Sequence, residues 1–332
     1  MKSKATVIAL LALLICSCGP NMVIEPVGER TIGGQEVRVE EIQFRSGKFK
    51  VVGNLLIPAG GDRYPAVILV HGDGPATRRT GSSTGPTTRV FVQNRFAVFS
   101  WDKPGSGEST GQINNALTQR AEILADGVAV LAEHPNIDPG RIGLWGISQA
   151  GWVMPLALEK RDDVAFMIVV SGGAEDSVEQ GAYMVSQQVL TDGGTEEQAA
   201  LVERYWAQQR KATDYDEYRE AMDVLTGIPQ VQSRYNLGIT EEKQWKPVPR
   251  EWDLFIDPMD IIEHTTTPVL AIFGESDRIV DPVQGAGAYE VALQAAGNQD
   301  YQIEVLPRAS HNLEGSPKYQ EILDSWIQHL SP

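Results

Sequence analysis

Residues 144–152, LWGISQAGW, hold a serine in a setting that suits a nucleophile. Gly146 stands two places before Ser148, as in the pattern G-x-S-x-G, but Ala150 occupies the place of the second glycine, which follows at Gly151. In a turn that presents a serine nucleophile the backbone is strained, and the residues two places away must be small. Alanine adds only a methyl group to glycine, so the pattern still predicts such a turn. The alternative is an ordinary turn whose serine hydroxyl caps the following helix.

A serine hydroxyl becomes a nucleophile when a base takes its proton and an acid orients that base. The chain has five histidines, of which four stand directly after a predicted strand, before a strand or near a helix end: His71, His134, His264 and His329. The fifth, His311, lies in the loop RASHNLEG after a predicted strand. We predict that His311 is the base, because a side chain in that loop can reach over the edge of a sheet.

Three carboxylates follow the predicted strand 268–273 in the stretch GESDRIVDP: Glu275, Asp277 and Asp281. Loops at the carboxyl ends of parallel strands are where sites form in open α/β sheets. We predict that Asp277 is the acid. Asp281 stands directly before Pro282, where an aspartate caps the start of a helix.

Alternating strands and helices provide the framework for these residues. The predicted strands are 37–44 and 49–57, joined as a hairpin, then 66–70, 96–101, 142–146, 164–170, 268–273 and 301–306. The predicted helices are 90–94, 117–133, 149–159, 281–296 and 317–330. Apolar runs such as 66–70 suit strands that are buried on both faces. The order predicts an α/β fold, a doubly wound and mostly parallel sheet with helices on both faces.

Residues 175–263 interrupt this alternation and divide the predicted core into 37–174 and 264–332. Helical periodicity at 178–190, 196–211 and 215–225, without a convincing strand, predicts an inserted helical cap. Its aromatic residues could line a pocket, or they could form a small helical core: Tyr183, Tyr205, Trp206, Tyr215, Tyr218, Tyr235, Trp245 and Trp252. Its acidic residues are interpreted as a solvated face: Glu179, Glu196, Glu197 and Glu203 among them.

The first residues predict an export signal. Lys2 and Lys4 precede an uncharged apolar run at 5–15 and then small residues, which is the pattern of a secretory signal peptide. The run is shorter than the roughly 20 residues that a membrane-spanning helix needs. Residues 15–18, ICSC, resemble a bacterial lipobox that would place a lipid on Cys18. We predict a signal peptide at 1–17 and a tether at 18–36; the alternatives are a plain cleaved signal and a cytoplasmic chain with an apolar tail.

Cysteine use and charge agree with export. Both cysteines, Cys16 and Cys18, lie in this segment, so the remaining chain has no thiol that could form a disulfide. Removal of residues 1–17 deletes Lys2 and Lys4 and no acid, which moves the formal net charge from −16 to −18. Such an acidic chain is a poor electrostatic partner for nucleic acid or an anionic bilayer. We therefore expect attachment to a membrane through the lipid anchor only, in the periplasm or at the cell surface of a bacterium.

Motifs for other chemistries do not occur. Gly105, Gly107 and Gly111 in DKPGSGESTG miss the G-x-G-x-x-G spacing of dinucleotide-binding turns. The sequence also contains no Walker lysine motif and no H-E-x-x-H. We therefore expect neither a nucleotide cofactor nor a metal.

From about residue 37 to the C-terminus the chain resembles the α/β-hydrolase superfamily. The order Ser148, Asp277, His311 is the order of that family. The first two residues of HGDG at 71–74 match its oxyanion loop, and FSWDKPGSGESTG matches its D-x-G-x-G-x-S loop with one extra proline-containing step. NIDPGRIGLWGISQAG and PVLAIFGESDRIVDP are similar to the bacterial branch of dienelactone hydrolases and prolyl-oligopeptidase-type domains, and within it to secreted or lipoprotein esterases.

The resemblance implies acyl transfer. His311 would remove the proton of Ser148, the serine would attack a carbonyl, and Asp277 would hold the imidazole. Water would then release the acyl-enzyme. The expected substrate is a small-molecule carboxylic ester. A peptidase or thioesterase of the same fold is the alternative chemistry, and a non-catalytic binding lipoprotein is the alternative class.

The same resemblance implies donors for the developing oxyanion. The backbone N–H of Gln149, at a helix start, and that of Asp73 or Gly74 would supply them, and each such donor commonly contributes roughly 3 kcal/mol. The carboxylate of Asp73 must then point away from the oxyanion, because it would otherwise oppose the negative charge.

Overall fold

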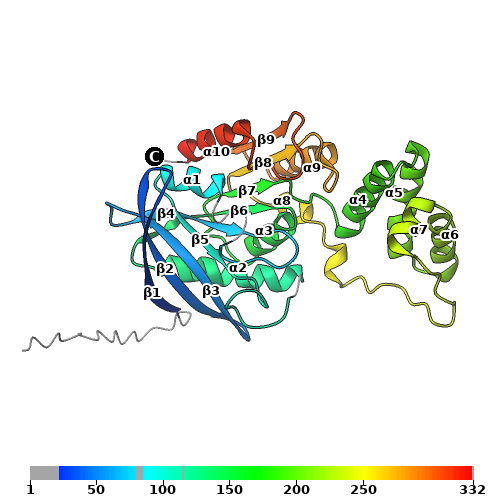
Figure 1. Cartoon of the computed structure of the whole chain (residues 1–332), viewed down its shortest axis with the longest axis horizontal. Coiled ribbons are helices and arrows are strands. Elements are labelled where there is room, and N and C mark those ends of the chain that lie inside the picture. The colour runs from blue at the N-terminus through cyan, green and yellow to red at the C-terminus, as the bar shows by residue number, and fades with distance from the viewer. Residues whose placement is uncertain (1–21, 80–84, 114–115, 331–332) are drawn as a thin grey trace, which may run out of the picture.

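The computed structural model describes residues 22–79, 85–113 and 116–330, which form a nine-stranded sheet with helices on both faces and a group of helices beside it (Figure 1). The strand order is β1-β2-β3-β5-β4-β6-β7-β8-β9. The predicted signal peptide at 1–17 and the predicted lipid site at Cys18 lie outside the described residues.

The strands of the sheet fall into an antiparallel part and a parallel part. They are β1 (Met22–Ile32), β2 (Gln35–Ser46), β3 (Phe49–Pro58), β4 (Tyr64–Val70), β5 (Ala97–Trp101), β6 (Ile137–Ile147), β7 (Met167–Val170), β8 (Val269–Gly274) and β9 (Tyr301–Leu306). β1, β2 and β3 pair antiparallel with one another, as does β3 with β5. From β5 to β9 all neighbours are parallel. The predicted hairpin and the predicted mostly parallel sheet are both confirmed.

Helices cover the two faces of the sheet. They are α1 (Pro86–Gln93), α2 (Leu117–Ala132), α3 (Ala150–Leu158), α9 (Pro282–Ala295) and α10 (Pro317–His329). Side chains of α2, α3 and α9 share one hydrophobic core with the sheet, and those of α1 and α10 share the other. Because β7 and β8 lie between these two cores, all their residues are buried, which explains their continuous apolar sequence.

The predicted tether at 18–36 is wrong for the part that the structure describes. Residues 22–32 form β1, which pairs with β2 from Met22 opposite Phe44 to Ile32 opposite Gln35. The side chains of β1 are nearly all exposed because it is the outermost strand, so its sequence lacks the apolar pattern of a buried strand. Pro26 and a register shift before Gly28 interrupt it, and both features discourage further pairing at a sheet edge.

β6 begins earlier than predicted. The stretch NIDPGR before residue 142 is predicted to be a turn, but the strand starts at Ile137, where it pairs with Tyr64. The register shifts between Tyr64 and Ala66, and Pro139 and Gly140 are exposed. Because the start of β6 is exposed and irregular, its residues are of the polar, proline and glycine types that are typical of a turn, which is why the sequence predicts a turn there.

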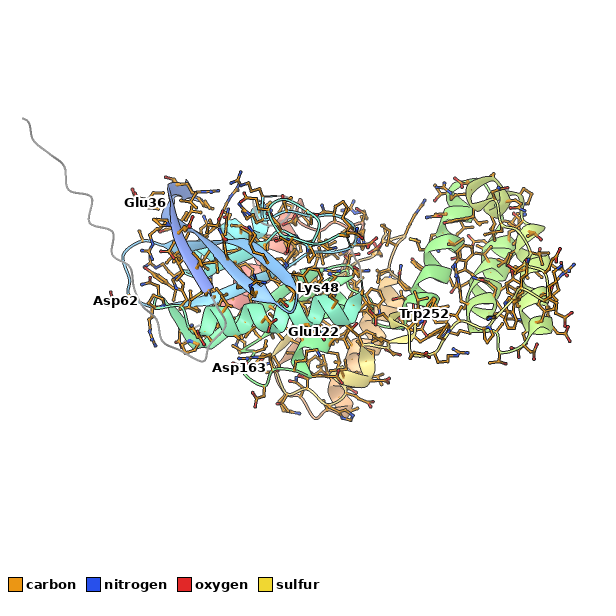
Figure 2. The ribbon with its side chains drawn as sticks, turned by 90° about the horizontal axis from the view of Figure 1, so that it is seen from below. Glu36, Lys48, Asp62, Glu122, Asp163 and Trp252 are labelled. Carbon is orange, nitrogen blue, oxygen red and sulfur yellow. The ribbon has the colours of Figure 1, made fainter. Side chains whose placement is uncertain are left out.

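A helical lobe leaves the sheet after β7. It comprises α4 (Ser177–Thr191), α5 (Glu196–Lys211), α6 (Tyr215–Thr226) and α7 (Pro229–Tyr235). The chain then returns through an irregular segment, the short helix η2 (Asp253–Phe255) and α8 (Met259–Ile262) to β8. Figures 1 and 2 show α5, α6 and α7 standing apart from the sheet, while α4 approaches it. The three predicted helices are present, and α7 is additional.

The lobe has a hydrophobic core of its own. Most of the aromatic residues noted in the sequence contribute to it: Tyr205, Trp206, Tyr215, Tyr218, Tyr235 and Trp245. Tyr218 and Trp245 stack with their ring centroids 5.5 Å apart. For these six residues the interpretation as a small helical core holds. Within the described chain, no helix has the length and apolarity to cross a bilayer.

Candidate active site

Ser148 occupies the turn between β6 and α3 in a strained conformation. Its φ of +58° lies in the left-handed region, which costs a non-glycine residue about 1–3 kcal/mol and persists only where the surroundings enforce it. Its N–H donates to Val170 O on β7 at 3.0 Å, and its carbonyl accepts from Gly151 N at 2.8 Å. The N-cap of α3 is Gln149. The backbone of Ser148 thus has the strained, left-handed conformation expected of the predicted turn, and the start of α3 has no side-chain cap bond among the described atoms.

Small residues around the turn explain the departure from G-x-S-x-G. A Cβ at Gly146 would lie 2.5 Å from Cβ of Ala150, which is fully buried, and 2.9 Å from Met154 Cε. A Cβ at Gly151 would lie 2.6 Å from the backbone N of Gly173. The displaced glycine therefore lets α3 approach the segment after β7, and Gly146 leaves the room that the alanine methyl needs.

His311 and Asp277 are brought together from the loops after β9 and β8. Nδ1 of His311 lies 2.8 Å from Oδ2 of Asp277. The His311 side chain is 21% exposed, whereas that of Asp277 is 1% exposed. The other carboxylate oxygen accepts from the N–H groups of Ile279 at 2.8 Å and Val280 at 3.2 Å. The loop backbone thus orients the carboxylate so that one oxygen faces the imidazole.

The other two carboxylates of this loop have different partners. Asp281 is the N-cap of α9 and accepts from Val283 N at 2.8 Å and Gln284 N at 3.1 Å. Glu275 accepts from the backbone N–H of Arg308 at 2.8 Å. Only the position of Asp277 matches that of an acid paired with His311.

The remaining histidines lie in other environments. Nε2 of His71 is 2.9 Å from Trp101 O, and burial lowers the pKa of His71 to about 4. His134 is buried against Glu40, with 2.8 Å between Nε2 and Oε2. His264 is exposed, and His329 lies 3.2 Å from Asp300 Oδ1.

The predicted oxyanion loop, residues 71–74, runs directly against the serine turn. A Cβ at Gly72 would lie 3.3 Å from Cβ of Ser148 and 3.2 Å from Ile147 O, so the backbone there is in close contact with the turn. Gly74 has a φ of +75°, which a side chain would disfavour. Asp73 between them is exposed.

Two buried cations lie behind this loop, and neither is predicted from the sequence. Lys103 is 3% exposed, and its Nζ donates to Gly72 O at 3.1 Å and to Gly74 O at 2.6 Å. Burial lowers the pKa of Lys103 to about 7, and the charge of Arg120 lowers it in the same direction.

Arg120, on the first turns of α2, is the second cation and is 6% exposed. Its guanidinium donates to His71 O and to the side-chain oxygen of Gln149. Burial lowers its pKa to about 10, and Asp73 raises it. It therefore stays charged at neutral pH and links the predicted oxyanion loop to the residue after the serine.

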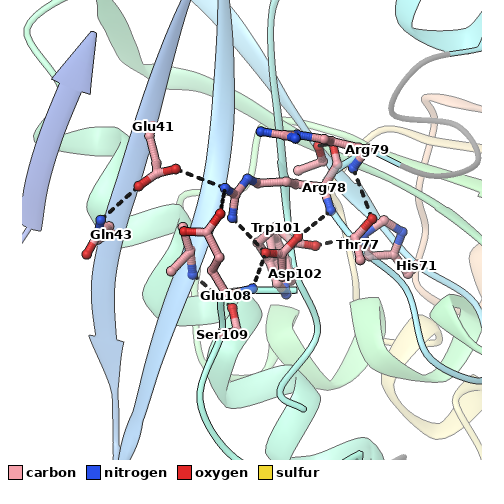
Figure 3. Close-up of polar contacts among 12 residues, drawn as sticks. Glu41, Gln43, His71, Thr77, Arg78, Arg79, Trp101, Asp102, Glu108 and Ser109 are labelled. Atoms are coloured by element: carbon pink, nitrogen blue, oxygen red, sulfur yellow. Dashed lines mark hydrogen bonds and ion pairs between the residues drawn. The ribbon is translucent and has the colours of Figure 1, made fainter. Parts of the chain in front are cut away.

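A third buried cation, Arg78, joins the loops after β4 and β5 (Figure 3). Its guanidinium pairs with Asp102 at 2.6 Å, Glu41 at 2.9 Å and Glu108 at 2.7 Å. Asp102 also accepts from the backbone N–H groups of Arg78 and Glu108, both at 2.8 Å. A side chain at Gly107 would collide with the Asp102 carboxylate. The D-x-G-x-G-x-S loop is thus a structural junction.

A cavity of about 570 Å³ opens beside Gln149, within the size range of small-molecule sites. Its walls come from the start of α2, the start of α4 and the returning segment: Ala116, Leu117, Thr118, Gln149, Ser177, Glu251, Trp252, Asp253 and Leu254. Trp252 is 54% exposed and lies between the sheet and the helical lobe (Figure 2). Asp253 holds the segment in place by accepting from Thr118 N at 3.2 Å. The sequence offers no sign that this segment returns to α2.

The helical lobe contacts the loop that carries Asp277. Tyr183 of α4 donates its hydroxyl to Asp277 O at 2.8 Å, and Gln180 donates to Ile279 O at 2.5 Å. Burial raises the pKa of Tyr183 to about 12. Burial also raises the pKa of Glu175, just before α4, to about 7, with the nearby Glu179 carboxylate as the next cause.

Comparisons with known proteins agree with this architecture. Residues 47–302 match the family model of X-Pro dipeptidyl-peptidase (S15 family). The chain is 23% identical over 246 residues to the uncharacterized peptidase YtmA of Bacillus subtilis, covering 74% of this chain and 76% of that one. It is 29% identical over 124 residues to the thiohydrolase aneE of Aspergillus aculeatus, which covers 36% of this chain and spans only 37% of the length of that relative.

Among solved structures, acetyl xylan esterase 1 from Thermoanaerobacterium sp. is similar with a TM-score of 0.58 and 12% identity, covering 94% of this chain and 89% of that one. At this identity the likeness concerns the fold, and it confirms the predicted α/β-hydrolase architecture. The family match runs from β3 to the start of β9 and includes the helical lobe. His311 lies after the last matched residue. The chain therefore belongs to the X-Pro dipeptidyl-peptidase (S15) family and is a hydrolase with the α/β-hydrolase fold.

Proposed function

We propose that the protein hydrolyses carboxylic esters of small molecules through an acyl-enzyme on Ser148. The observation that carries the proposal is the left-handed backbone of Ser148, with a φ of +58°, on the same sheet edge as the hydrogen-bonded pair of His311 and Asp277. The three residues follow β6, β9 and β8, whose carboxyl ends meet at that edge because the strands from β6 to β9 are parallel.

In the proposed mechanism His311 takes the proton of the Ser148 hydroxyl through Nε2 while Oγ forms a bond to the ester carbonyl carbon. The carboxylate of Asp277 stabilises the imidazolium through Nδ1–H. Collapse of the tetrahedral intermediate breaks the bond to the alcohol, which leaves with the proton from Nε2. Water then attacks the acyl carbon with His311 again as the base, and Ser148 is released.

The negative oxygen of each tetrahedral intermediate needs preorganised donors. The N–H of Gln149 at the start of α3 and the N–H of Asp73 or Gly74 fill this role in the proposal. The close contact between Gly72 and the serine turn supports it, because it brings the peptide units of the oxyanion loop to Ser148.

The cavity beside Gln149 is the proposed substrate pocket, and the helical lobe is its cap. Ala116, Leu117, Trp252 and Leu254 supply apolar surface on its walls, so the group that it accepts is an apolar acyl or alcohol group. A series of p-nitrophenyl esters from acetate to palmitate tests the length of that group, since kcat/KM should rise with chain length until the pocket is filled and then fall.

Peptide hydrolysis is the second candidate, because the matching family model describes a peptidase family and YtmA is named as a peptidase. It predicts that aminoacyl-naphthylamides are cleaved at rates comparable with esters. Thioester cleavage is the third chemistry of the same site, in view of the thiohydrolase relative, and acyl-thiocholines test it.

Hydrolysis of p-nitrophenyl butyrate by the full chain tests the proposed function. Ser148→Ala should abolish the activity, and Ser233→Ala, which changes an exposed serine of α7, should leave it intact. Equal turnover in Ser148→Ala would remove this serine from the mechanism. A chain without any hydrolysis that still binds small molecules would support the non-catalytic alternative.

We also propose that the protein is exported and anchored to a membrane by a lipid on Cys18. The lipobox-like sequence ICSC supports this proposal. Labelling of bacteria with a fatty-acid analogue should mark the protein, and Cys18→Ser should lose the label. Retention of the label in Cys18→Ser would refute this site.

A further inference from the structure

Lys103 is a buried cation without a role in the proton transfers proposed above. A buried ammonium is costly unless its hydrogen bonds are made, and lysines are rarely found fully buried. Here Nζ donates to the carbonyls of Gly72 and Gly74, so the side chain is committed to the backbone of the oxyanion loop. Lys103 belongs to a different segment, the loop after β5, and so holds the oxyanion loop from outside.

The chemistry of the peptide bond makes these contacts relevant to the oxyanion. The carbonyl of Gly72 and the N–H of Asp73 belong to one conjugated peptide unit. A cation on the oxygen draws electron density from the unit, and its N–H becomes a stronger hydrogen-bond donor. Arg120 acts in the same way on the preceding unit, because it donates to His71 O, and that unit carries the N–H of Gly72. Both cations thus act on the peptide units in contact with the serine turn.

Neighbouring contacts keep the two loops in register. The backbone N–H of Lys103 donates to Ala76 O at 3.0 Å. Directly before it, Asp102 binds Arg78 through both the backbone and the guanidinium (Figure 3). Residues 102 and 103 therefore hold the segment from Gly72 to Arg78 at several points. Among these contacts, the bond from Lys103 Nζ to Gly72 O is made at the residue that lies against the serine turn.

We propose that Lys103 is a positioning residue for ester hydrolysis, which fixes the peptide between Gly72 and Asp73 and strengthens the Asp73 N–H as a donor to the oxyanion. This inference rests on the proposed function, since it requires a tetrahedral intermediate at Ser148. It also selects Asp73 rather than Gly74 as the second donor.

The charge of Lys103 responds to pH in the range where such an enzyme works. Burial and the positive charge of Arg120 lower its pKa to about 7, and the carboxylate of Asp73 opposes this shift. The titratable His71 also lies near Lys103, and burial keeps it neutral with a pKa of about 4; the carboxylate of the preceding residue, Asp102, is paired with Arg78. As pH rises through about 7, the amine loses its charge and the Asp73 N–H loses donor strength.

Steady-state kinetics of the full chain with p-nitrophenyl butyrate test the inference. At about pH 6.5, Lys103→Met should lower kcat about 10- to 100-fold and change KM by less than about twofold, because the bound ester carries no oxyanion and the negative charge develops only on the way to the tetrahedral intermediate. Affinity for a trifluoromethyl ketone, whose adduct with serine carries the oxyanion, should fall by the same factor. Lys160→Met, which changes an exposed lysine after α3, is the matched control and should retain kcat.

The pH profile separates positioning from a purely structural role. In the wild type, kcat should decline above about pH 7, and Lys103→Arg should move that decline upward because a guanidinium keeps its charge. If Lys103→Met does not fold, the comparison of Lys103→Arg with the wild type decides. An unchanged alkaline limb in Lys103→Arg, or a kcat retained by Lys103→Met, would overturn the inference. Absence of any Ser148-dependent hydrolysis in the wild type would instead refute the proposed function.

Discussion

Asp277→Asn and Asp281→Asn form a matched pair of substitutions in one loop. Each aspartate accepts two backbone N–H bonds through one oxygen, and the two differ in that Asp277 alone also reaches His311. In Asp277→Asn the amide oxygen can keep the bonds to Ile279 and Val280. The amide NH₂ then faces Nδ1 of the imidazole, where a carboxylate oxygen accepted before.

The size of the effect follows from the tautomer of the imidazole. An NH₂ donor requires Nδ1 to be an acceptor, so the proton moves to Nε2, and Nε2 can no longer take the proton of Ser148. Loss of the correct tautomer in a serine hydrolase triad lowers kcat about 10,000-fold, or about 5 kcal/mol of transition-state stabilisation. In Asp281→Asn the asparagine still caps α9, so stability should change by less than about 0.5 kcal/mol. Its kcat should stay within about twofold.

The assay is kcat for p-nitrophenyl butyrate, with the melting temperature of each variant as the check on folding. Labelling of Ser148 by a fluorophosphonate gives an independent measure, since His311 must also take the serine proton as Oγ attacks phosphorus and fluoride leaves. A larger loss in Asp281→Asn than in Asp277→Asn would reassign the acid. A kcat within about tenfold of the wild type in a folded Asp277→Asn would show that His311 does not depend on this carboxylate.

Three further substitutions probe the surroundings of the site. Ala150→Gly should destabilise the protein by about 1 kcal/mol, because a buried methyl group is lost. It should leave kcat within about threefold of the wild type, because Gly146 already leaves room for that methyl group. A large gain in kcat would show that the methyl group narrows the turn. Trp252→Ala should raise KM about fivefold for butyrate or longer esters and much less for acetate, and an equal effect on both would place Trp252 outside the pocket. Glu175 has a folded pKa of about 7 against an ordinary value of 4.5, so its contribution to stability is lost as pH rises between these values. Glu175→Gln should therefore stabilise the protein by about 1 kcal/mol, after solvent screening, at about pH 8 and should not stabilise it at about pH 4.5. Thermal melts at both pH values check this difference.

The serine turn can be predicted from sequence because its determinants are local. Gly146 and Ala150 stand two residues from Ser148, and the steric requirement of the turn acts over that distance. Asp277 and His311 are far apart in the chain, yet alternating strands and helices predict that both follow parallel strands and reach the same sheet edge. The doubly wound fold is predictable for the same reason.

The buried cations could not be predicted because their partners are remote. Lys103 and Arg120 bind backbone carbonyls 29 to 49 residues away, and lysine or arginine in a sequence ordinarily belongs to the surface. β1 escaped prediction because an exposed edge strand needs no apolar alternation. Trp252 lies in an irregular segment, so neither its approach to α2 nor its place on the cavity wall has a sequence signal.

The edge strand β1 changes how far a lipid-anchored form could stand from a bilayer. A tether over residues 18–36 would reach roughly 65 Å when extended at about 3.4 Å per residue. Since Met22 already belongs to the sheet as the first residue of β1, the sheet begins only four residues after Cys18 in the sequence, and four residues span at most roughly 14 Å. A lipid on Cys18 would therefore hold the enzyme close to the membrane surface rather than at the end of a long flexible tether. Its substrates would then be those that reach the headgroup layer, and insertion of a flexible spacer before Met22 would widen that choice.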